Sequence, residues 1–326
     1  MTALSYEEQL RHIIAIAGLA PSVHNTQPWR FALLEDGLEL RADPAKGLPV
    51  LDADGRQLHL SCGAALYHAR VCARALGLHT RVRLLPDPQS PTTLATMVIT
   101  PGPPPRPEEV QLATAILHRH TFRGRFDPEP VPEPLVAKLC EVAESEGAVL
   151  RRVSTQQDVV ELAVLLDHAT RDEERDPAYR EELRRWLRTE PDAADGLLPA
   201  AIDPSSQGSV VRQRDFTLSH PQQLDGSTPE AERPLLVVLG TASDDPLSWL
   251  RAGQALAAVL LHAADADVQA QPLGQVTDAT GYRRRLQQSL GMIAMPQLVL
   301  RMGRAPRVAA TSPRRDLDDV LVPVGG

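Results

Sequence analysis

Polar and basic residues that could carry chemistry gather in two short segments that lie far apart in the chain. The first, residues 20–29, reads A-P-S-V-H-N-T-Q-P-W. Pro21 ends the helix before it, because proline lacks an amide hydrogen and restricts the residue that precedes it. Ser22, Asn25 and Gln27 then offer compact polar groups at the start of a strand. These groups suit a flat heteroaromatic ring with alternating N–H and C=O positions, whereas the simpler interpretation is a polar turn with an N-capping serine.

The second segment, residues 118–126, reads H-R-H-T-F-R-G-R-F. Arg119, Arg123 and Arg125 fall within seven residues, together with the Thr121 hydroxyl and Gly124, and guanidinium groups bind phosphate bidentately. A phosphate site is therefore one interpretation, and a solvated basic turn is the other. The two histidines have no accompanying cysteine or carboxylate cluster, so we expect no metal.

Paired arginines recur near the C-terminus, at Arg314 and Arg315. Such arginines are usually exposed to solvent. They would contact a ligand only if the C-terminal tail folds back onto it. Sequence patterns for a dinucleotide-binding fingerprint, a P-loop, a zinc protease or a hydrolase nucleophile elbow are absent.

The elements that must position these segments are duplicated. Residues 6–20 place Leu10, Ile13, Ile14 and Ala17 on one helical face, and residues 133–147 repeat that spacing. A second pair of helices, residues 60–78 and 251–268, is rich in alanine and glycine and aligns with Gly63 on Gly253. Small residues of this kind let two helix backbones approach closely, so we expect these two helices to pack against each other. The pattern predicts a fused pseudo-dimer.

Strands and boundaries complete this prediction. Extended segments are expected at residues 80–85, 95–100, 234–239 and 297–302. Residues 29–41 are expected to form a hairpin that turns at Asp36-Gly37. The two halves are expected to span residues 1–100 and 111–326, joined by a stiff Pro-rich linker at 101–110. Residues 176–233 fit no repeat, and we expect an insertion that is helical over 179–187 and then loop, as in a lid.

Composition excludes several classes of protein. The formal net charge of −8 argues against a general phosphate-backbone binder. No apolar run is long enough to span a membrane, and the N-terminus lacks a signal-peptide pattern. The three cysteines show no paired spacing, which is typical of reduced thiols in a cytoplasmic protein.

Taken together, these segments resemble the FMN-dependent nitroreductase family. Residues 20–29 match its A-P-S-x-x-N-x-Q-P-W element, and R-H-T-F-R matches its basic element. The A-P-S-x-x-N-x-Q-P-W element precedes the basic element in this chain, and this order resembles the Acg-like single-chain branch of the family. The P-Q-L-V-L-R-M-G stretch at 296–303 and the S-P-R-R tail also resemble that branch. The resemblance covers essentially the whole chain. It implies an α+β, nitroreductase-like fold of two duplicated halves, with the insertion as a lid over the flavin. One composite site is expected, because Ala148 and Arg151 stand where Ser22 and Asn25 would recur.

The resemblance also implies a role for individual residues, from the phosphate to the ring of FMN. The phosphate and ribityl chain would be bound by Arg119, Thr121 and Arg123, with added charge from Arg314 and Arg315. Ser22 and Asn25 would contact the ring, and His24 would lie adjacent to it. Gln27 and Trp29 would fix the turn. Leu273-Gly274 would place backbone amides near the flavin N5.

Two functions of different classes follow from this resemblance. One is NAD(P)H-dependent reduction of a small planar nitro or quinone acceptor through FMN. The other is an Acg-like flavin-sequestering or redox-sensing protein with little turnover, so whether the chain is an enzyme stays open. A flavin-free scaffold is a third interpretation. A monomer, or a weak homodimer, is expected because the internal pseudo-dimer removes the need for a partner.

Overall fold

Two sheets of equivalent topology organise the computed structural model, which describes residues 5–190, 192–199, 211–214, 216, 232–306 and 311–323. The strand orders are β1-β2-β4-β3 and β5-β6-β8-β7, and neighbouring strands are antiparallel. The first half contains α1 (Tyr6–Ala17), β1 (Trp29–Leu34), β2 (Gly37–Ala42), α2 (Arg56–Ala75), β3 (Leu78–Leu84) and β4 (Thr93–Pro101). Its counterpart contains α4 (Glu133–Ser145), β5 (Val149–Arg152), β6 (Leu235–Thr241), α7 (Pro246–Asp265), β7 (Val268–Leu273) and β8 (Met295–Arg304). The predicted duplication is therefore present in the topology.

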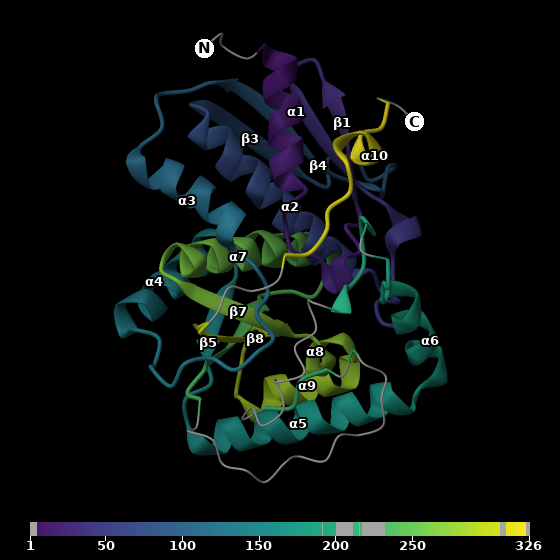
Figure 1. Cartoon of the computed structure of the whole chain (residues 1–326), viewed down its shortest axis with the longest axis vertical. Coiled ribbons are helices and arrows are strands. Elements are labelled where there is room, and N and C mark those ends of the chain that lie inside the picture. The colour runs from purple at the N-terminus through teal and green to yellow at the C-terminus, as the bar shows by residue number, and fades with distance from the viewer. Residues whose placement is uncertain are drawn as a thin grey trace.

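The two central helices, α2 and α7, pack against each other between the sheets (Figure 1). Gly63 and Gly253 meet at this contact. A Cβ atom on Gly63 would lie 2.3 Å from the carbonyl oxygen of Leu250, and one on Gly253 would lie 2.1 Å from that of Leu60. Any side chain at either position would push the helices apart. The predicted alignment of Gly63 with Gly253 thus corresponds to a physical contact across the pseudo-two-fold seam.

The first hairpin forms, but its turn lies one residue earlier than the predicted Asp36-Gly37. Leu34 pairs with Gly37, so the turn residues are Glu35 and Asp36, and Gly37 is the first residue of β2. A Cβ atom on Gly37 would lie 2.0 Å from the carbonyl oxygen of Met97 in β4. Gly37 is therefore required by the close approach of a neighbouring strand.

The Pro-rich linker is shorter than predicted. β4 continues to Pro101, and α3 (Pro107–His118) begins inside the expected linker. Proline is tolerated in the first helical turn, where its missing amide hydrogen is not needed. The linker prediction over 101–110 was wrong in extent, because a proline-rich composition does not by itself exclude a helix start.

The C-terminal tail crosses from the second half to the first. Val322 donates its amide hydrogen to the carbonyl of Phe31 at 2.8 Å, next to α10 (Leu317–Val320). Figure 1 shows the yellow tail running beside α1 and β1. Residues 111–326, predicted as the second half, therefore do not all lie in the second half of the structure, because their C-terminal tail packs against the first half.

The insertion packs onto the first half through α6 (Pro177–Trp186), which confirms the helical start predicted at 179–187. Tyr179 and Leu183 bury their side chains against Leu48 and Leu51. The carboxylate of Glu182 accepts the amide hydrogens of Val50 at 2.9 Å and Leu51 at 2.8 Å. Predictions for 191, 200–210, 215 and 217–231 lie outside the described residues. The remaining helices are α5 (Gln156–Arg175), α8 (Gln275–Asp278) and α9 (Thr280–Ser289), with 3-10 turns at Val23–Asn25 and Pro44–Lys46.

Candidate functional site

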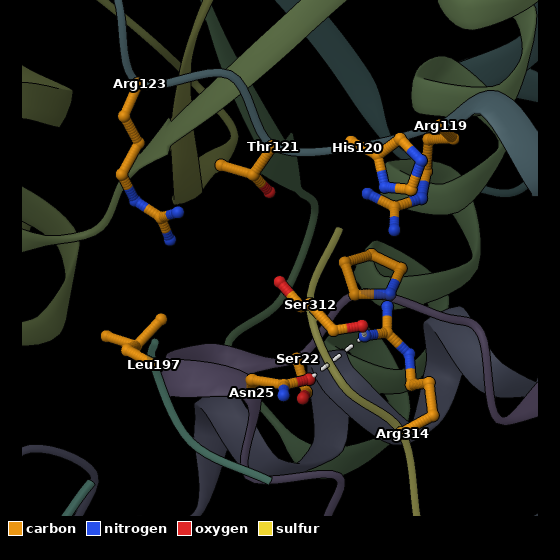
Figure 2. A pocket seen from close by; sticks show the side chains of 10 residues that line it. Ser22, Asn25, Arg119, His120, Thr121, Arg123, Leu197, Ser312 and Arg314 are labelled. Carbon is orange, nitrogen blue, oxygen red and sulfur yellow. Dashed lines mark hydrogen bonds between the residues drawn. The ribbon is translucent and has the colours of Figure 1, made fainter. Parts of the chain in front are cut away.

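A small pocket lies where both halves, the insertion and the C-terminal tail meet. It has a cavity volume of about 40 Å³, enough for a few water molecules. Figure 2 shows three guanidinium groups directed toward the space beside Ser22 and Asn25. The lining residues are Pro21, Ser22, Asn25, Arg119, His120, Thr121, Arg123, Leu197, Ser312 and Arg314. The polar turn and the arginine segment, far apart in sequence, thus share one pocket.

The turn from Ser22 to Gln27 holds an unusual backbone conformation. His24, Asn25 and Gln27 have φ of 48°, 55° and 50°, in the left-handed region that side chains disfavour. The Ser22 hydroxyl accepts the amide hydrogen of Gln27 at 3.0 Å, so the serine stabilises the turn as well as lining the pocket. Strained residues of this kind cluster at functional sites, where surrounding contacts maintain them.

Two segments from elsewhere in the chain stabilise this turn. Asn25 Nδ2 donates to the carbonyl oxygens of Gly196 at 3.0 Å and Pro313 at 3.1 Å. Gln27 Nε2 donates to the carbonyl oxygen of Ala194 at 2.9 Å. The turn is thereby covered by residues 192–199 of the insertion and by the tail.

Positive charge is concentrated in the pocket, where the side chains of Arg119, Arg123 and Arg314 meet. Among the described residues, the Nε atoms of Arg119 and Arg314 have no hydrogen-bond partner, and no carboxylate pairs with either side chain. Burial and the charge of Arg314 lower the pKa of Arg119 to about 9, and burial lowers that of Arg314 to about 10. Burial and Arg214 lower the pKa of Arg123 to about 10. Buried like charges are costly, and a bound anion would reduce that cost.

The arginine segment takes its place from the second sheet. Thr121 bridges to Ala270 of β7, and the amide hydrogen of Phe122 bonds to the carbonyl of Ala270 at 3.1 Å. Arg119 directly follows α3, which ends at His118. The segment is thus fixed at one end by a helix terminus and along its length by a strand.

Several of the predicted site residues lie outside the pocket lining. Trp29 is fully buried in the core from β1, and Leu273 is fully buried beside Val299 and Val276. Gly274 precedes α8, and its carbonyl accepts the amide hydrogens of Thr277 and Asp278. Gln27 and Arg315 bond to each other, since the amide of Arg315 donates to Gln27 Oε1 at 2.9 Å.

His24 is buried behind the pocket lining, where its ring lies edge-on to Phe216 with ring centroids 5.8 Å apart. Its Nε2 atom has no hydrogen-bond partner among the described residues. Burial, with the charges of Arg214 and Arg123, lowers its pKa well below the ordinary value, so the ring is neutral near pH 7.

Four pocket residues were absent from the predicted set: Pro21, His120, Leu197 and Ser312. Pro21 and His120 stand next to predicted residues, and Ser312 stands two residues before Arg314, so proximity in the sequence was the available signal. Leu197 lies in a polar insertion without a motif, and nothing in the local sequence marks it. In the described part of the chain, no helix is long and apolar enough to cross a membrane, and no cluster of side chains is suited to a metal.

Comparison with known proteins gives consistent matches. A family model described as "Nitroreductase family" matches residues 6–61. "Putative NAD(P)H nitroreductase Rv3131" of Mycobacterium tuberculosis is 35% identical over 321 residues, covering 96% of this chain and 91% of the relative. "Putative NAD(P)H nitroreductase acg" of the same species is 29% identical, covering 96% and 95%. A solved nitroreductase with bound FMN from Desulfitobacterium hafniense is 12% identical, covers 64% of this chain and 96% of its own, and has a TM-score of 0.40.

Proposed function

The chain belongs to the nitroreductase family, and we propose that it is an FMN-dependent oxidoreductase that uses NAD(P)H to reduce a small planar nitro or quinone acceptor. The observation that carries this proposal is the pocket in which buried arginines from the second half and the tail face the Ser22–Asn25 turn of the first half. The cytoplasmic location and the monomeric state remain predictions.

The residues present fit the phosphate of FMN. Arg119 and Arg314 carry guanidinium nitrogens without partners among the described residues, and Arg123 and Thr121 face the same space. A phosphate monoester would neutralise this charge and supply hydrogen-bond acceptors, each charge-assisted bond contributing about 1.5–3 kcal/mol. Arg315 would act indirectly, because it is bonded to Gln27 rather than directed into the pocket.

The flavin would supply the hydride chemistry when bound. Ser22 and Asn25 would orient it from the first half, and the neutral ring of His24 would offer a nearby hydrogen-bonding atom. Gln27 and Trp29 would maintain the turn, and the backbone of Leu273-Gly274 remains our prediction for the N5 side. Residues of the insertion would exclude water, since Leu197 lines the pocket.

One observation favours a second candidate, a flavin-sequestering protein with little turnover. Residues 192–199 are hydrogen-bonded to both Asn25 and Gln27, and the pocket beside them has a volume of only about 40 Å³. If these contacts persisted with FMN bound, they would leave little room for a nicotinamide or an acceptor. The protein would then hold the flavin with little turnover.

The test is reconstitution with FMN followed by anaerobic addition of NADPH, with the visible spectrum recorded at each step. We expect bound FMN, bleaching of the flavin band by NADPH and recovery of the band on adding a quinone. Retained flavin that dithionite reduces but neither NADPH nor NADH does would favour the sequestering function. A protein that binds no FMN would refute both.

A double variant tests whether the arginine segment binds the phosphate of FMN. Replacing Arg119 and Arg123 together with alanine should weaken FMN binding at least 100-fold, on the order of two lost charge-assisted hydrogen bonds. The matched control replaces Arg81 and Arg83, which are exposed on β3, and should leave FMN affinity unchanged. Equal affinity in both double variants would place the phosphate elsewhere.

A further inference from the structure

An arginine is completely buried in the middle of the second sheet. Arg301 lies on β8 with a side-chain exposure of 0%. Its neighbours Leu300 and Met302 belong to the main core, so strand alternation directs Arg301 to the opposite face. The arginine segment of the pocket runs past this site: residues 121 and 122 pair with the edge strand β7, and Gly124 and Phe126 contact Arg301.

The Arg301 guanidinium is bonded on several sides. It forms an ion pair with Glu232, with both carboxylate oxygens at 2.7 and 2.8 Å. It donates to the carbonyl oxygen of Gly124 and, at 3.1 Å, to Gln271 Oε1. The ring of Phe126 lies over the guanidinium at 4.5 Å.

Glu232 adds a second connection to the same segment. Its carboxylate accepts the amide hydrogen of Phe126 at 3.0 Å. The ring of Phe126 also packs closely against the backbone of Gly303 in β8. A Cβ atom on Gly303 would lie only 2.7 Å from this ring. The ion pair thus holds residues 124 and 126, whereas Ala270 holds residue 122.

These attachments alternate along the segment. Phe122, Gly124 and Phe126 are buried toward the sheet, whereas Thr121 and Arg123 are less buried and line the pocket. The attached residues Phe122 and Gly124 flank Arg123 on both sides, and Phe122 directly follows Thr121. Fixing the attached residues therefore restricts where the side chains of Thr121 and Arg123 can lie.

A buried ion pair is a costly way to gain stability, since well-packed apolar residues of similar size often serve as well or better. Its hydrogen bonds, however, specify positions in a way that apolar packing does not. We propose that Arg301, paired with Glu232, is a positioning residue that fixes residues 121–126 so that Thr121 and Arg123 face the phosphate. This inference rests on the proposed function, in which the pocket holds the FMN phosphate.

The experiment compares the dissociation constants of FMN and riboflavin, which differ only in the phosphate. The wild-type protein should bind FMN at least 100-fold more tightly than riboflavin. Arg301→Met combined with Glu232→Leu removes both charges, so it avoids an unpaired buried ion. We expect this variant to fold, to lose at least tenfold in FMN affinity and to change less than twofold in riboflavin affinity.

Matched variants separate positioning from general destabilisation. Arg70→Met with Glu146→Leu removes another ion pair, away from the pocket, and should leave the FMN-to-riboflavin ratio unchanged. Arg301→Lys keeps the positive charge but loses the planar guanidinium group that bonds to both carboxylate oxygens. This variant should give an intermediate FMN-to-riboflavin affinity ratio. If the double variant does not fold, Glu232→Gln, which keeps an acceptor for the Phe126 amide, should show a reduced ratio.

The two hypotheses fail in different ways. A wild-type protein that binds no FMN would refute the proposed function, whereas one that binds FMN and riboflavin equally would refute the phosphate pocket and with it the positioning role. A wild-type protein that prefers FMN, together with an unchanged ratio in every folded Arg301 or Glu232 variant, would overturn the positioning role alone.

Discussion

At the scale of single residues, Arg119 is the least compensated charge in the pocket. Its hydrogen bond from Nη2 to the carbonyl oxygen of Leu19 is long, at 3.4 Å, and its Nε atom has no partner among the described residues. The neighbouring Arg314, by contrast, also donates to the carbonyl oxygens of Leu19 and Ala20. The charge of Arg119 therefore contributes little to the ligand-free fold and is available for an anion.

Arg119→Met should accordingly separate binding from stability. Without ligand, we expect the free energy of unfolding to stay the same or to rise by about 1 kcal/mol, because a buried charge is removed and most of the side-chain volume is kept. The thermal stabilisation by inorganic phosphate or FMN should fall sharply. Urea unfolding and thermal shifts with and without ligand measure both effects, with exposed Arg81→Met as the control. A loss of several kcal/mol in the ligand-free protein would contradict this interpretation.

At the scale of elements, the start of α2 depends on a carboxylate. Asp52 accepts the amide hydrogens of Gln57 at 2.8 Å and Leu58 at 2.9 Å. Burial nevertheless raises the pKa of Asp52 to about 6, against these hydrogen bonds and the nearby charge of Arg56, which lower it. A carboxyl group whose pKa is higher in the folded than in the unfolded state stabilises the fold at low pH, and this contribution is lost as the pH rises through 6.

Asp52→Asn should remove that pH dependence. Relative to wild type, the variant's free energy of unfolding should increase by about 1 kcal/mol between pH 5 and pH 7, because only the wild type must ionise a buried carboxyl group. Urea unfolding at the two pH values gives this difference directly. Asp54→Asn, at an exposed position nearby, should show no such change. A difference of the opposite sign would mean that the two amide hydrogen bonds dominate.

At the scale of the whole molecule, the seam between α2 and α7 joins the halves. The buried residues of α1, α2, α4 and α7 and of one face of each sheet belong to one hydrophobic cluster, so the two halves share their main core. The other face of the second sheet packs a smaller cluster with α5, α8 and α9. We therefore expect the two halves to unfold in a single transition.

Gly253→Ala should destabilise both halves together. Its Cβ atom would lie 2.1 Å from the carbonyl oxygen of Leu60, so the helices must separate, at a cost of about 3 kcal/mol. Gly281→Ala is the matched control, because a Cβ atom there meets nothing within 4 Å, and it should stabilise the protein by up to about 1 kcal/mol. Circular dichroism and tryptophan fluorescence should report coincident urea transitions. Separate transitions would show independent halves.

Local patterns in the sequence determined the duplicated helices, the first hairpin and several strands, but not helices such as α3 and α5. The helical spacing of Leu10, Ile13, Ile14 and Ala17, which are all buried, and the Gly63–Gly253 alignment are local or pairwise signals that burial and close packing impose directly. Only the tertiary structure decided that Leu197 and Ser312 line the pocket, that Trp29 and Leu273 belong to the core, and that Arg301 supports the arginine segment. The physical reason is that hydrophobic periodicity reports which side of an element is buried. Which distant segments meet there depends on how all the elements pack.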